Sequence, residues 1–100
     1  MIPVHIGEFQ RLMKELYGEN DRTRGMEKTM LWFFEEVGEL AEAMRKEDRA
    51  AIEEEMADVF AWMVSMANMM DIDVEKACLT KYPMKCTRCD SMPCRCEKSR

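Results

Sequence analysis

The chain has 100 residues, of which 47% are hydrophobic and 35% are charged. This length and composition favour one globular domain with a core of moderate size, and they exclude a disordered chain. Residues 1–82 carry a net charge of −8 and residues 83–100 one of +3, so the acidic body argues against binding the phosphate backbone of a nucleic acid.

Hydrophobic spacing predicts two helices in the first half of the chain. The first is expected over about residues 5–17, where apolar side chains recur at helical spacing, and Gly18 is expected to end it. A polar, turn-rich segment at residues 19–25 follows. The second helix is long and is expected over about residues 26–46.

Two further helices are predicted in the second half. Asp48 is expected to cap a third helix that runs to about residue 70. Asp73 is expected to cap a short fourth helix over residues 74–81, and Pro83 follows the end of the helical body. No segment alternates like a strand, so the predicted fold class is all-α.

Acidic side chains are stacked on the second and third predicted helices. Glu39 follows Glu35 and Glu36 by four and three residues, and Asp58 follows Glu55 by three. Like charges at these spacings each destabilise an isolated helix by a few tenths of a kcal/mol. None of the five has a lysine or arginine three or four residues away, so a compensating positive charge is expected against this surface.

The position of these acids around each helix predicts a metal site. At about 100° per residue, each acidic pair lies at the same edge of the apolar stripe of its helix. If the stripes pack together, the four carboxylates converge, and a divalent cation is needed to keep them charged. All-oxygen ligation suits Mg²⁺, Mn²⁺ or Ca²⁺, and Mg²⁺ also binds phosphate oxygens, which points to phosphoryl chemistry. The alternative is a solvated acidic face without an ion.

The pattern EExxE followed by ExxD, in the surroundings EEVGELAEA and EEEMADVFAW, resembles that of the MazG-type all-α nucleoside triphosphate pyrophosphohydrolases. The resemblance covers roughly Met26 to Pro83, and the two motifs are specific only in combination. It implies hydrolysis of ribo- or deoxyribonucleoside triphosphates between the α and β phosphates, which gives monophosphate and pyrophosphate, and a task such as nucleotide-pool house-cleaning. It also implies a homodimer or homotetramer, in which antiparallel helices form four-helix-bundle packing around each site. The ligands that it implies for Mg²⁺ (or Mn²⁺) are Glu36, Glu39, Glu55 and Asp58.

Glu35 completes the set of catalytic candidates. The expected reaction is attack of water, activated by the cation, on the α phosphorus. Glu35 precedes the ligand Glu36 and lies about 100° from it around the helix. It is therefore expected to support a ligand, or to reach the site of a neighbouring subunit. Glu54 stands in the same relation to Glu55.

Cysteines form a second motif near the C-terminus. Cys86, Cys89, Cys94 and Cys96 give CxxC, four residues and CxC, while Cys78 stands apart upstream. This spacing favours a four-cysteine site for structural Zn²⁺, with free or redox-active thiols and disulfides as alternatives. The expected role is to pin the C-terminus, to complete a subunit interface or to dock a partner. The chain is thus predicted to divide into a helical domain, residues 1–82, and a zinc-binding tail, residues 83–100, that folds only with metal.

Four other side chains are candidate substrate contacts. Trp62 and Trp32 fall near the carboxylate edge of their helices, where each can stack on a nucleobase or simply pack. Lys28 and Lys81 can meet phosphates, although exposed lysines are common. His5, the single histidine, receives no role.

No apolar run approaches the 18 residues of a membrane span, and residues 1–5 resemble no secretory signal. A cytoplasmic protein without a membrane or nucleic-acid partner is therefore expected. The alternative to an enzyme is a non-catalytic module, whose acidic cleft binds metal and nucleotide and whose zinc tail docks a protein. A di-iron bundle is disfavoured because the chain has no Glu-x-x-His pair.

Overall fold

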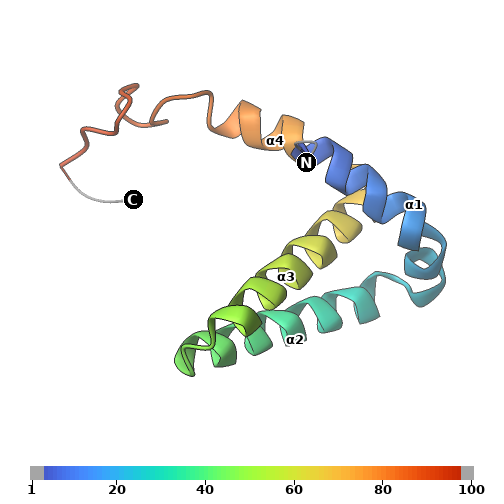
Figure 1. Ribbon diagram of the computed structural model, residues 1–100. Helices are drawn as coiled ribbons and strands as arrows, with labels where there is room; N and C mark the ends of the chain where they lie inside the picture. Colours follow the sequence, from blue (N-terminus) through green and yellow to red (C-terminus); the bar gives the residue numbers. More distant parts are fainter. Residues whose placement is uncertain (1–3, 98–100) are drawn as a thin grey trace.

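The computed structural model describes residues 4–97 and contains four α-helices (Figure 1). No strand occurs within this range, and the predicted all-α class is confirmed. None of these helices combines the length and the hydropathy that a membrane crossing requires. The outer ends of the two predicted domains, residues 1–3 and 98–100, lie outside the described residues. The helices are α1 (Ile6–Arg24), α2 (Met26–Arg45), α3 (Arg49–Met69) and α4 (Val74–Lys81).

The α2 and α3 helices form an antiparallel hairpin, and α1 packs against α3 and also contacts α2 and α4 (Figure 1). The hairpin turn ends at Asp48, whose Oδ1 accepts the N–H of Ala51 at 3.2 Å. Asp73 caps α4 in the same way and accepts the N–H of Lys76 at 3.0 Å. Both predicted N-caps are confirmed. They could be predicted from the sequence because each depends on a single aspartate next to its own helix.

The predicted end of the first helix at Gly18 is wrong. The α1 helix continues to Arg24 and ends at Gly25, which has a φ of 90°. A glycine inside a helix costs about 1 kcal/mol, but the added turns bury Asp21 and pair it with Arg24 at 2.9 Å. These contacts outweigh the cost of Gly18 inside the helix. The end of α1 therefore reaches the α2–α3 hairpin.

A polar network fixes α1 against the C-terminal end of α3. The buried Gln10 side chain donates to Asn68 Oδ1 at 3.0 Å and to the carbonyl oxygen of Ile72 at 2.7 Å. Its Oε1 accepts the N–H of Val74 at 3.0 Å, and Asn68 donates back to the carbonyl oxygen of Gln10 at 3.0 Å. The bonds therefore join α1, α3 and the start of α4.

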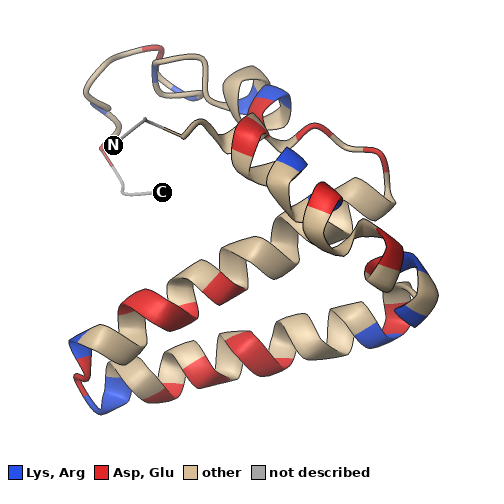
Figure 2. Ribbon diagram, turned by 45° about the vertical axis from the view of Figure 1, so that its right-hand side comes forward, with Lys and Arg blue, Asp and Glu red and all other residues tan. Residues whose placement is uncertain are grey.

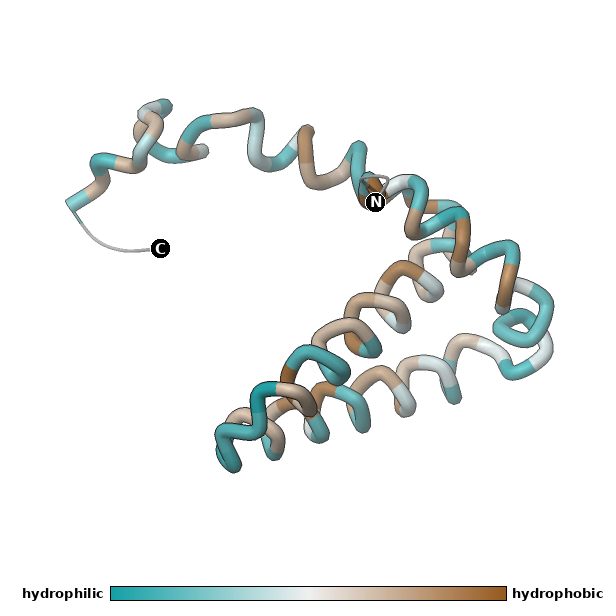
Figure 3. Tube along the Cα trace, in the orientation of Figure 1, coloured by the Kyte–Doolittle hydropathy of each residue, from teal (hydrophilic) through white to brown (hydrophobic). Residues whose placement is uncertain are grey.

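The hydrophobic core is small for this chain. The buried apolar residues within the described range are Met13, Ala43, Val64 and Ala67. Figure 3 shows apolar segments along both helices of the hairpin, but several of them stay open to solvent. The chain exposes 8237 Å², whereas a compact monomer of this mass exposes about 5,900 Å². Exposed apolar side chains such as Leu31 and Phe34 of α2 contribute to this excess.

Candidate metal centre and adjoining cavity

Acidic segments occur on both neighbouring helices of the α2–α3 hairpin (Figure 2). Glu36 and Glu39 of α2 and Glu55 of α3 each place one carboxylate oxygen within 4.8 Å of the others. Glu36 and Glu55 are half-buried and Glu39 is exposed. The structure therefore brings together three of the four predicted metal ligands, because the antiparallel hairpin sets the acidic edges of both helices side by side.

Within residues 4–97, no salt bridge compensates the charge on this cluster. Glu36 Oε2 and Glu55 Oε2 are buried and have no hydrogen-bond partner among residues 4–97. The pKa of Glu36 is raised from 4.5 to about 7, first because burial desolvates its carboxyl group. The neighbouring Glu55 carboxyl group and the negative charges of Glu39 and Asp58 raise this pKa further.

A divalent cation fits these observations. It would supply a partner for the two unpaired oxygens and the positive charge that the cluster lacks. The donors are all carboxylate oxygens, which suit hard cations such as Mg²⁺ and Mn²⁺ and not soft ones.

The other predicted acids are placed differently. Asp58 follows Glu55 by one turn of α3 and lies outside the three-carboxylate cluster, although it is close enough to raise the pKa of Glu36. Its side chain borders a cavity instead. Glu35 and Glu54 are exposed and also lie outside the cluster. Within one chain, neither reaches the three clustered carboxylates.

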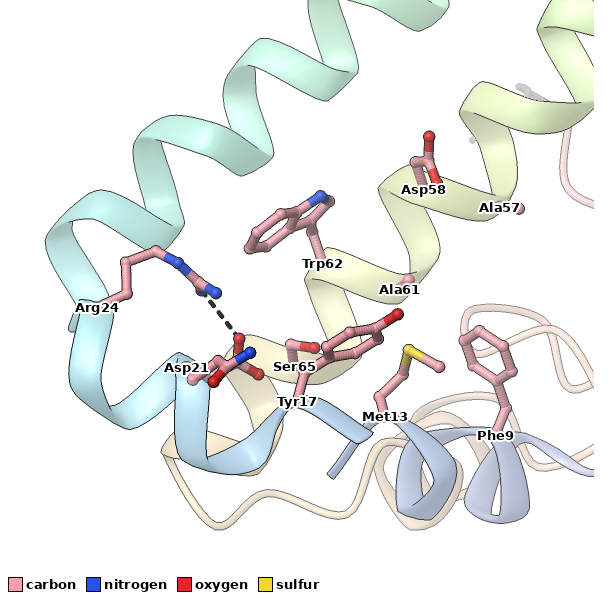
Figure 4. A pocket seen from close by; sticks show the side chains of 11 residues that line it. Phe9, Met13, Tyr17, Asp21, Arg24, Ala57, Asp58, Ala61, Trp62 and Ser65 are labelled. Atoms are coloured by element: carbon pink, nitrogen blue, oxygen red, sulfur yellow. Dashed lines mark hydrogen bonds and ion pairs between the residues drawn. The ribbon is translucent and has the colours of Figure 1, made fainter. Parts of the chain in front are cut away.

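A cavity of about 550 Å³ opens beside Asp58, between α1 and α3 (Figure 4). This volume lies within the range of small-molecule sites, which are typically apolar with a few polar groups. The aromatic residues that line it are Phe9, Tyr17 and Trp62, and Asn20, Asp21 and Ser65 are among the polar ones. Asp58 connects the cavity with the acidic cluster, since it lines the cavity and follows Glu55 by one turn of α3.

Arg24 joins α1 to the two tryptophans beside this cavity. Its guanidinium carbon lies 4.9 Å from the ring centroid of Trp32 and 4.8 Å from that of Trp62, and the two indoles meet edge to face. Its Nη1 donates to Asp21 Oδ1 at 2.9 Å, as Figure 4 shows, and to Thr29 Oγ1 at 3.1 Å. Cation–π contact and the pair with Asp21 therefore hold Arg24 in place.

The contribution of α1 is absent from the sequence-based prediction, since Asp21 and Arg24 fall in the segment expected to be a loop. The sequence does contain a signal that the first helix continues to Arg24. Asp21 and Arg24 are three residues apart, as in a helical ion pair, and Gly25 follows them as at a helix end. Of the predicted lysines, Lys28 is exposed on α2 and Lys81 ends α4, and neither lines the cavity.

The cysteine sulfurs of the tail also lie together. The Sγ atoms of the four predicted ligands all lie within 4.8 Å of one another. Cys78, which is exposed on α4, is not part of this group. All five cysteines are free thiols.

The chain matches the MazG nucleotide pyrophosphohydrolase domain over residues 24–89. The match takes in α2, α3 and α4, and therefore the clustered carboxylates and Asp58. It leaves out nearly all of α1 and the cysteines at 94 and 96. A comparison with curated proteins gives no match. Because the matched segment covers well over half of the chain and carries the facing carboxylates, the chain belongs to the MazG nucleotide pyrophosphohydrolase family.

Proposed function

We propose that the protein hydrolyses ribo- or deoxyribonucleoside triphosphates to monophosphate and pyrophosphate, with Mg²⁺ or Mn²⁺ as the required cation. The observation that carries the proposal is the cluster of Glu36, Glu39 and Glu55 beside a cavity of about 550 Å³. Membership of the MazG family supports a nucleotide as the substrate, and the acidic cluster supports a metal-dependent reaction. Such a hydrolase would suit house-cleaning of a cytoplasmic nucleotide pool.

In this proposal the three clustered glutamates hold the cation, and Asp58 completes the ligand set on the side of the cavity. The cation, when bound, neutralises phosphate charge and makes water a competent nucleophile near neutral pH. Glu36 must lose its proton before it can act as a ligand, so its raised pKa makes metal binding depend on pH. Glu35, which lies on a different face of α2, orients a ligand or serves the site of a neighbouring copy.

The cavity beside Asp58 receives the nucleoside in this proposal. Trp62 and Tyr17 line it, and aromatic rings can stack on any base. Asp21 adds selectivity, since its Oδ2 is buried without a partner among the described residues and can accept a hydrogen bond from a base N–H group. Trp32 acts through Trp62 and Arg24, which it contacts. Neither Lys28 nor Lys81 lines the cavity, so we assign the phosphates to the cation.

We also propose that copies of the chain associate as a homodimer or homotetramer. The exposed surface exceeds that of a compact monomer of equal mass by more than 2,000 Å². Residues 83–97, none of which is buried, account for part of this excess, and exposed apolar side chains of the helices account for another part. Leu31 and Phe34 of α2 are 67% and 60% exposed. Covering this face would complete four-helix packing around the acidic cluster.

The first prediction concerns the products. With Mg²⁺, at least one triphosphate in a panel that varies base and sugar should give monophosphate and pyrophosphate in equal amounts, and chelation should stop the reaction. Anion-exchange chromatography resolves pyrophosphate from orthophosphate. A diphosphate with orthophosphate would contradict the cleavage position, and metal-dependent binding without turnover would favour the non-catalytic module.

The second prediction concerns the ligands. Glu39→Gln and Asp58→Asn should each lower kcat/KM more than about 100-fold, because an amide keeps the shape of the side chain but not the charge that holds the cation. The fold should remain, and the metal-free stability should stay equal or rise as repulsion is relieved. Steady-state kinetics and thermal unfolding measure both effects.

The matched control is Glu53→Gln, which removes one exposed carboxylate from the same helix, α3, outside the cluster. This variant should keep the wild-type rate. Equal activity in Glu39→Gln, Asp58→Asn and the control would place the metal site elsewhere.

The third prediction concerns pH. Between about pH 4.5 and pH 7, folded metal-free protein holds a proton on Glu36 that the unfolded chain has released. This group therefore makes the free energy of unfolding fall as pH rises through that window. Added Mg²⁺ should stabilise the protein more at pH 8 than at pH 5.5, because protons compete with the cation. Urea unfolding with and without chelator measures both trends.

The comparison for this prediction is Glu36→Gln, which cannot titrate. In this variant, the free energy of unfolding should lack the fall that Glu36 contributes between pH 4.5 and pH 7. Identical pH profiles in the wild type and this variant would show that Glu36 does not carry the raised pKa.

The fourth prediction concerns association. Light scattering should give at least twice the mass of one chain at micromolar concentration. Phe34→Lys should lower the mass, because a charge replaces an apolar side chain in the interface. Leu79→Lys, which alters a similarly exposed residue on α4, should not. A wild-type protein that is monomeric and fully active would contradict the proposal.

A further inference from the structure

The cysteine sulfurs that follow α4 have the spacing of a metal site. The Sγ atoms of Cys86, Cys89, Cys94 and Cys96 all lie within 4.8 Å of one another, and Cys86 Sγ lies 3.8 Å from Cys96 Sγ. Four thiolates at about 2.3 Å from a tetrahedral zinc lie about 3.8 Å from one another. The observed separation corresponds to this edge length and is far longer than the bond of about 2 Å in a disulfide.

Backbone N–H groups are directed at three of these sulfurs. Such donors stabilise negative charge on a thiolate and orient it, as in the surroundings of metal-bound sulfur. Two backbone hydrogen bonds of 2.9 Å also close residues 86–91 into a turn: the N–H of Cys86 donates to the carbonyl oxygen of Ser91, and the N–H of Asp90 donates to that of Cys86. The N–H donors and their acceptors are Arg88 to Cys86 (3.5 Å), Arg95 to Cys89 (3.3 Å) and Cys96 to Cys94 (3.4 Å).

Hydrophobic burial cannot account for the shape of this segment. No residue from 83 to 97 is buried, and none belongs to a helix or strand. Figure 1 shows the segment extending from α4, away from the α2–α3 hairpin. An ordered loop without a core needs a covalent or metal cross-link, and all its cysteines are free thiols.

We infer that Cys86, Cys89, Cys94 and Cys96 bind one structural Zn²⁺. Four soft thiolates select zinc over the hard cations that suit the carboxylate cluster. Four protein ligands leave no position open for substrate, so this site orders the tail and does not take part in hydrolysis. The family match ends at residue 89, before the second cysteine pair, and the inference therefore stands apart from the proposed enzyme activity.

The fifth prediction is the metal content of the full chain. Protein purified without chelator should carry close to one zinc per chain by mass spectrometry of the metals. Cobalt substituted for zinc should show the strong visible bands of tetrahedral coordination together with sulfur-to-cobalt charge transfer. The carboxylate cluster, which has only oxygen donors, cannot give the sulfur bands.

Two variants and their controls identify the ligands. Replacing Cys89 and Cys94 together by Ser should abolish zinc and the sulfur bands. Cys78→Ser, outside the cluster, and Glu39→Gln, in the other metal centre, should keep both. Zinc retained by the double variant, or lost equally from Cys78→Ser, would overturn the assignment.

Limited trypsin digestion tests the structural role. Arg88 and Arg95 are exposed cleavage sites within the segment. Both should resist trypsin with zinc and be cut at least about tenfold faster after zinc removal, while far-ultraviolet circular dichroism shows α1–α4 retained. Equal cleavage with and without zinc, or intact mass showing two disulfides and no metal in the purified chain, would overturn the inference.

Discussion

Repulsion between like charges on two packed helices is the constraint on which this structure depends. Glu36 and Glu39 on α2 face Glu55 on α3, with one oxygen from each within 4.8 Å of the others. No lysine or arginine among the described residues forms a salt bridge with these carboxylates, and the pKa of Glu36 rises to about 7 as burial and the neighbouring carboxylates act together. A fold that keeps such a cluster gives up stability in the metal-free state, and the proposed cation would restore that stability on binding.

The α1 helix packs on this acidic hairpin and forms a cavity with α3. The network around Gln10 fixes α1 on α3, and the last turns of α1 bring Asp21 and Arg24 to the two tryptophans. The cavity of about 550 Å³ lies between α1 and α3, and Asp58 is one of the residues that line it. The groups proposed to bind cation and nucleoside therefore come from different parts of the chain, and their alignment depends on how α1 packs.

Local signals in the sequence predict much of this fold. The caps at Asp48 and Asp73 and the bounds of α4 follow from residues within one turn of each helix end. The predicted end of α1 at Gly18 is wrong, because the burial of Asp21 favours the added turns and is a tertiary contact that spacing in the sequence does not show. Spacing also indicates which edge of α2 and α3 is acidic. It does not reveal that Asp58 borders a cavity, since this depends on where α1 crosses α3.

Crystals of the full chain grown with Mn²⁺ would locate the cation, since anomalous scattering marks the position of Mn²⁺. We expect a strong peak between the carboxylates of Glu36, Glu39 and Glu55, with Asp58 turned toward it. The peak should be absent from crystals of Glu39→Gln grown in the same way. A peak elsewhere in the wild-type protein, or none at a saturating concentration of Mn²⁺, would contradict the claim that these carboxylates form a metal centre.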